Sequence, residues 1–179
     1  IAMAAFERWT PGAMAGGDAM MVHSVLIYAF SLSALAAGPI AILAIRLMAD
    51  RLFARDVGGV PGILLVALAG GGVLALVLGA GVFGVWAALP LVPAAWASLL
   101  LAWLTQIWIA APLLTALRRY RAVPLAYLLG VGGAAACLAC VGHLGGTWVL
   151  ASVTGGAGLT LAAVLVLLRR HFTAPAIMP

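Results

Sequence analysis

The stretch 62–85, GILLVALAGGGVLALVLGAGVFGV, carries no charged residue and is long enough to cross a bilayer. About 20 apolar residues in a helix, at about 1.5 Å per residue, span the hydrocarbon core of a membrane. Four further stretches have the same character, and they cover residues 22–45, 93–117, 123–143 and 147–168. The sequence therefore predicts an all-α, polytopic integral membrane protein with a bundle of five transmembrane helices.

The overall composition agrees with that prediction. Hydrophobic residues make up 66% of the chain and the mean hydropathy is +1.26, whereas ordinary soluble domains are about 45–50% apolar. The chain is basic, but its arginines form short clusters between apolar stretches and no continuous stripe on a folded face. We therefore expect the lipid bilayer as a partner and no nucleic acid.

The arginines also predict the orientation of the chain in the membrane. They cluster after the first, third and fifth predicted helices, and the positive-inside bias makes that side cytoplasmic. Residues 1–21 are then an extracytoplasmic N-terminal segment, 22–168 the transmembrane domain and 169–179 a cytoplasmic tail, in a multi-pass protein of the bacterial inner (plasma) membrane. The clusters are Arg46, Arg51 and Arg55; Arg118, Arg119 and Arg121; and Arg169 and Arg170.

A row of small residues marks one face of the second predicted helix. Gly71, Ala75 and Gly79 are spaced four residues apart, and small residues at this spacing let two helix backbones approach closely. The row is either an internal contact of the five-helix bundle or an interface with other membrane protein subunits.

Charged groups are absent from the five predicted spans. Proton pumps, cation antiporters and voltage sensors build their pathways on such groups, so this chain alone fits none of those classes. The sequence also has no paired carboxylates, no nucleophile–base pair and no phosphate-binding glycine loop with a lysine. We therefore expect no catalytic activity from this chain alone.

The polar residues within the spans are few. Ser31, Thr105, Gln106 and Ser152 are candidates for lining a path for a neutral or apolar solute, or for hydrogen bonds between helices. Cys137 and Cys140 form a C-x-x-C pattern within a predicted helix. Because thiols in apolar surroundings are inert, we interpret both cysteines as small packing residues.

Two histidines fall at the same predicted depth on different helices. His23 begins the first span and His143 ends the fourth. Such a pair could supply the axial ligands of a b-type haem, or hold copper or zinc together with Cys140. The alternative is that both are interfacial side chains that contact water and lipid headgroups, so no cofactor is assigned.

Tryptophans concentrate on the third predicted helix, where Trp96 and Trp103 share a face. A buried indole N–H needs an acceptor, or the ring needs a flat partner such as a quinone or porphyrin. The alternative is that these rings fill the bundle or face lipid.

Short motifs resemble those of two known families. Val22-His23, together with His143-Leu144-Gly145-Gly146, resembles a family of small bacterial inner-membrane proteins of unknown function. In that family the first helix opens with Val-His-Phe-Pro, and here the Phe-Pro is missing. The stretch 28–38 resembles the first helix of quinol-oxidising anchor subunits of molybdenum reductases. Both resemblances imply a redox membrane.

These observations lead to two functional hypotheses. The first is a membrane-embedded subunit of a larger bioenergetic (electron-transfer) or transport assembly, associated with haem or quinone. Its basis is a small extramembrane mass and spans with few groups that can do chemistry. The alternative is a small transporter or channel component for a neutral or apolar solute.

Overall fold

The computed structural model describes residues 16–54, 57–116 and 122–173, and this part of the chain is helical almost throughout. Five of its helices are long and apolar enough to cross a membrane, which confirms the predicted all-α architecture. In chain order the elements are α2 (Gly16–Phe53), the 3-10 turn η1 (Val57–Gly59), α3 (Val60–Gly79), its π-helical continuation η2 (Ala80–Trp86), α4 (Leu91–Ala116), α5 (Ala122–Val141), the 3-10 turn η3 (Gly142–Leu144) and α6 (Gly146–Thr173).

The first and last helices are longer than the predicted spans. α2 has 38 residues and is therefore about 57 Å long, whereas the hydrocarbon core is about 30 Å thick. The apolar stretch 22–45 marks only the part that fits this core, and the flanking Ala, Met, Leu and Arg residues are strong helix formers. Part of the predicted N-terminal segment is thus helical from Gly16 onward, and α6 continues to Thr173, into the predicted tail. Residues 1–15 lie outside the described part.

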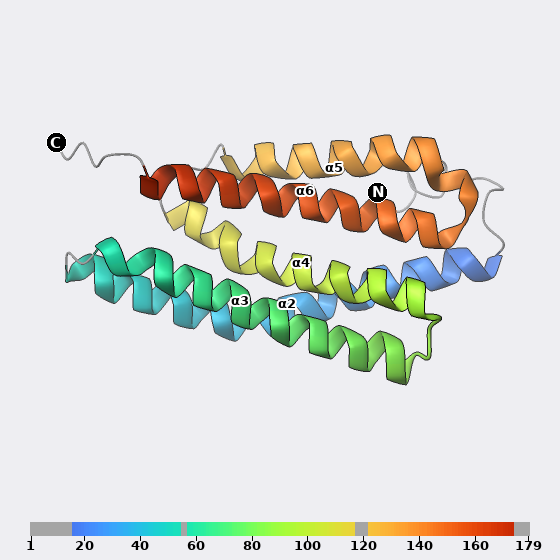
Figure 1. Ribbon diagram of the computed structural model, residues 1–179, viewed down its shortest axis with the longest axis horizontal. Coiled ribbons are helices and arrows are strands. Elements are labelled where there is room, and N and C mark those ends of the chain that lie inside the picture. The colour runs from blue at the N-terminus through green and yellow to red at the C-terminus, as the bar shows by residue number, and fades with distance from the viewer. Residues whose placement is uncertain (1–15, 55–56, 117–121, 174–179) are drawn as a thin grey trace.

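α4 is the central helix of the bundle. It lies between the pair α2 and α3 on one side and the hairpin of α5 and α6 on the other (Figure 1). In an 18-residue apolar stretch of α4, 61% of the residues are buried, whereas in the corresponding stretch of α5 only 11% are buried. α5 packs mainly against α6, so most of its surface faces outward. The fully buried apolar residues of α4 are Ala97, Leu100, Leu101, Ile109 and Ala110.

Small residues lie at the closest contacts between helices. A Cβ added at Gly79 would lie 2.7 Å from the Cα of Ser98, so the backbones of α3 and α4 approach closely there. Gly71 packs against Ile109 of the same helix α4, and Ala75 is fully buried. The row Gly71, Ala75, Gly79 is therefore an internal contact of the bundle.

A single tight connection joins α5 to α6 and also reaches α2. Gly145 has a φ of +119°, a conformation that favours glycine because it has no Cβ. The next amide N–H, that of Gly146, donates a hydrogen bond to Oδ2 of Asp18 over 3.3 Å. This contact links the start of α2 to the start of α6.

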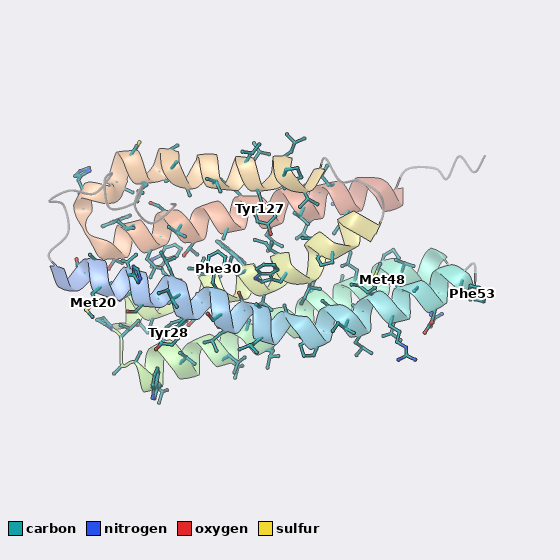
Figure 2. All side chains as sticks on the ribbon, turned by 180° about the vertical axis from the view of Figure 1, so that it is seen from behind. Met20, Tyr28, Phe30, Met48, Phe53 and Tyr127 are labelled. Atoms are coloured by element: carbon teal, nitrogen blue, oxygen red, sulfur yellow. The ribbon has the colours of Figure 1, made fainter. Side chains whose placement is uncertain are left out.

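The described arginines gather at one end of the bundle. α2 ends, α3 begins and α6 ends at the left of Figure 1, and Figure 2 shows Met20 and Phe53 near opposite ends of α2. Arg46, Arg51 and Arg169 therefore lie towards the same end, whereas η3, with His143, lies at the other. Arg55, Arg118, Arg119 and Arg121 lie outside the described residues. Which end is cytoplasmic stays a prediction from the charge pattern.

Candidate functional site

Buried hydroxyl groups in the bundle bond to their own helices. Thr105 donates to the carbonyl of Leu101 over 2.8 Å, and Ser152 donates to that of Trp148 over 2.9 Å. Among the described residues, no buried side-chain nitrogen or oxygen lacks a hydrogen-bond partner. The buried hydroxyls of the described residues are thus already satisfied by carbonyls of the helix backbone. Ser33, Ser98, Thr154 and Thr160 also donate to a carbonyl three or four residues earlier.

The four residues proposed to line a solute path lie in different surroundings. Ser31 is exposed on α2, whereas Thr105 and Ser152 are buried on α4 and α6. Gln106 is half-buried, and its Nε2 lies 2.5 Å from the place where a Cβ on Gly72 would stand. The missing side chain of Gly72 thus makes room for the amide of Gln106 between α3 and α4.

Gln106 borders a cavity between α3, α4 and α6, which we call the α3–α6 cavity. Its volume is about 620 Å³. Leucines of α3 and α6 form most of its wall, and Arg169 of α6 is the charged residue that borders it. Pro61 and Arg169 belong to the start of α3 and the end of α6, so the cavity begins at the arginine-rich end of the bundle.

A second hollow, the α2–α3 groove, lies between α2 and α3 with a volume of about 500 Å³. Its lining is entirely apolar or glycine, with Ile40 and Leu47 from α2 and Ile63 and Val66 from α3. The two hollows thus flank α3, and among the described residues that line them Arg169 of the α3–α6 cavity is the only cationic one.

The histidines and cysteines lie on exposed surfaces. His23 and His143 are both exposed near the same end of the bundle, and the described residues hold no group of three or more His, Cys, Asp or Glu side chains that could bind a metal ion. Cys137 and Cys140 are exposed on α5. The interpretation of these cysteines as packing residues is therefore wrong, because α5 contacts the bundle through one narrow face only.

Two tryptophans of α4, Trp96 and Trp103, pack against other parts of the chain. The ring of Trp103 lies over Gly158 of α6, where an added Cβ would stand 2.6 Å from Cζ3. Trp96 packs at the edge of the apolar core, and its carbonyl accepts a hydrogen bond from Thr154 over 3.4 Å. The indole of Trp103 therefore fills space between α4 and α6, whereas that of Trp96 packs against the apolar core.

The positions of two residues in the structure were not indicated by the sequence pattern. Asp18 belongs to the predicted N-terminal segment, and in the structure its carboxylate accepts a hydrogen bond at the start of α6. Arg169 was read only as a topology anchor, although it borders a cavity. A lone acid shortly before the first span was the available signal for Asp18, whereas the cavity beside Arg169 depends on how α3 and α6 pack.

The fold and its apolar exposed surface define a multi-pass helical membrane protein with contacts suited to lipid and to other helices. Residues 1–178 match the sequence profile of the PelG family, which is described as "Putative exopolysaccharide Exporter (EPS-E)". The match covers nearly the whole chain, and the chain belongs to this family. No curated protein and no solved structure gives a significant match to the chain. The family indicates a role related to membrane transport.

Proposed function

We propose that this chain is a membrane-embedded part of an exopolysaccharide exporter. The observation that carries the proposal is the family match over residues 1–178, together with five helices that suit a membrane. Both hypotheses from the sequence include a role in transport, and that part of them agrees with this family. The haem and electron-transfer alternative gains no support from it, and the two exposed histidines add none.

A polysaccharide is hydrophilic, so a path for it through the bilayer must offer hydrogen-bonding groups. The buried hydroxyls described above already bond to their own helix carbonyls, and both hollows beside α3 are almost wholly apolar. The five helices therefore supply one wall or a scaffold of the path. Further helices, from a longer polypeptide or from another subunit, complete it.

α5 is the surface that we assign to those further helices. It contacts α6 closely through Gly130 and Gly156 and leaves its opposite side exposed. Large apolar side chains dominate that side, including Leu125, Leu128 and Val131. An apolar helix surface of this kind can lie against lipid or against a partner helix with equal chemical compatibility, and an exporter of a hydrophilic polymer needs the partner.

Deletion of the chain in its native bacterium tests the proposal. We expect secreted exopolysaccharide to fall to the background level and to recover when the wild-type chain is supplied from a plasmid. The polymer is measured separately in the medium and in the cell lysate. Unchanged secretion in the deletion strain would contradict the proposal. Wild-type levels of a control secreted protein in the same strain would exclude a general export defect.

A further inference from the structure

We propose that the α3–α6 cavity is a binding site for an anionic phospholipid, with the headgroup phosphate on Arg169 and an acyl chain along the leucines of α3 and α6. This inference goes beyond the export function and does not depend on the transported polymer. It rests on the shape of the cavity, its apolar lining and the position of its one cationic side chain.

The cavity has the dimensions and lining of a lipid site. Its volume of about 620 Å³ falls within the range of about 300–1,000 Å³ that is typical of small-molecule sites. Its lining includes Leu64 and Leu68 of α3 and Leu165 of α6. A cavity on the bilayer side of a membrane protein is surrounded by lipid, so an acyl chain is the occupant that matches this apolar wall.

Arg169 gives the cavity a chemical preference. It is exposed near the end of α6, at the level where α3 begins and where phospholipid headgroups would lie. A guanidinium group has five N–H donors, so Arg169 can bind a phosphate with two parallel hydrogen bonds beside the interaction that it already makes within the chain. Basic pockets between transmembrane helices bind anionic headgroups in this way.

The α2–α3 groove serves as an internal comparison. It lies on the other side of α3 and has a similar volume of about 500 Å³, and none of the described residues that line it is charged. It can therefore hold acyl chains, but it offers nothing that distinguishes an anionic from a zwitterionic lipid. Selectivity for anionic lipid is expected at the α3–α6 cavity alone.

Two matched pairs of variants separate this site from general attraction to the membrane surface. Arg169→Gln removes the cation at the cavity, and Arg46→Gln removes an exposed cation of α2 that borders neither hollow. Leu65→Trp fills the α3–α6 cavity, and Val66→Trp fills the α2–α3 groove. Leu65 and Val66 are neighbours and are both 69% exposed, so the two insertions differ mainly in which hollow they occupy.

The experiment measures lipid retained by the purified full chain, using native mass spectrometry. The added lipids are phosphatidylglycerol and phosphatidylcholine with identical acyl chains. We expect the wild type to prefer phosphatidylglycerol by about tenfold, as one charge-assisted contact allows. Arg169→Gln should remove most of that preference and Leu65→Trp should remove the bound lipid, whereas Arg46→Gln and Val66→Trp should leave the preference unchanged.

Three results would overturn the proposal. One is an equal loss of preference in Arg169→Gln and Arg46→Gln, which would show general surface electrostatics. Another is full retention of phosphatidylglycerol by Leu65→Trp. The third is displacement of the lipid by millimolar inorganic phosphate, which would show a phosphate site without a role for the acyl chain. Each variant is accepted only if it elutes as the wild type does, and Arg169→Met, which also removes the charge, replaces Arg169→Gln if the latter fails to fold.

Discussion

At the scale of single residues, the contact between Gly130 and Gly156 holds α5 to the rest of the bundle. A Cβ added at Gly156 would lie 2.6 Å from the carbonyl oxygen of Gly130 and 2.5 Å from the Cβ of Ala134. These distances leave no room for a side chain without moving the helices apart. The contact therefore depends on the absence of a side chain at position 156.

Gly156→Leu should destabilise the protein by pushing α5 away from α6. Overpacking typically lowers the free energy of unfolding by about 1–3 kcal/mol. Because Gly156 contacts backbone atoms, which cannot move aside easily, we expect Gly156→Leu to lie at the upper end of this range. The measurement is the midpoint of thermal unfolding in detergent. Gly155→Leu is the matched control, because nothing lies within 4 Å of a Cβ at Gly155. An equal drop in both variants would show that the helix contact is not the cause.

The hydrogen bond between Asp18 and the amide of Gly146 makes a second prediction at this scale. The carboxylate lies at the start of α6, where the unpaired N–H groups and the helix dipole favour negative charge. Asp18→Ala should lower the free energy of unfolding by about 0.5–2 kcal/mol. Asp50→Ala removes an exposed acid at the other end of α2 and should change stability less. Equal effects would contradict a role for this contact.

At the scale of helices, consecutive spans cross the membrane in opposite directions. The loop after α2 and the turn between α5 and α6 therefore lie on opposite membrane faces. We expect Ala54 to be cytoplasmic and Leu144 to be outside. Cysteine is introduced at one position at a time after Cys137 and Cys140, which are exposed, are replaced by alanine. A membrane-impermeant maleimide added to intact spheroplasts should label Leu144→Cys and spare Ala54→Cys.

Permeabilised cells provide the control for this experiment, because both positions are exposed and should then react. Labelling of Ala54→Cys in sealed spheroplasts would reverse the orientation predicted from the arginines. Labelling of both positions there would contradict five alternating spans.

The sequence predicts the number of helices well and their mutual packing poorly. Hydrophobic stretches such as 62–85 are visible because no charge interrupts them, whereas their ends extend as helix beyond the hydrocarbon, as α2 does to Phe53. In a helix that is apolar on all sides, the hydrophobic residues have no periodic spacing that would mark the buried face. Rows of small residues were the usable signal, and Gly71, Ala75 and Gly79 do pack against α4.

The candidate site was less accessible to prediction. Ser31, Thr105 and Gln106 were selected for polarity alone, and the structure distributes them over an exposed surface, a buried helix contact and a cavity border. The polarity of a residue does not indicate which way its side chain points around the helix axis. The α3–α6 cavity forms between helices distant in sequence, so no local pattern in the sequence could indicate it.

At the scale of the whole molecule, the bundle has a buried central helix, a weakly covered α5 and hollows that are mainly apolar. This arrangement suits a scaffold within a larger membrane exporter better than a self-contained conduit for a sugar polymer. If α5 contacts further helices in that assembly, Leu128→Trp should weaken co-purification of the chain with its native partners. Val77→Trp, at an exposed position on α3, is the control and should leave co-purification unchanged.

The central claim, that the chain takes part in moving exopolysaccharide across the membrane, is tested most directly in inverted membrane vesicles of the native bacterium. Polymer is made at the outer surface of these vesicles from a labelled sugar nucleotide, and a glycoside hydrolase is then added outside. The account predicts that labelled polymer enters the lumen and resists the hydrolase in wild-type vesicles, and stays digestible in vesicles that lack the chain. Equal amounts of protected polymer in both preparations would contradict it.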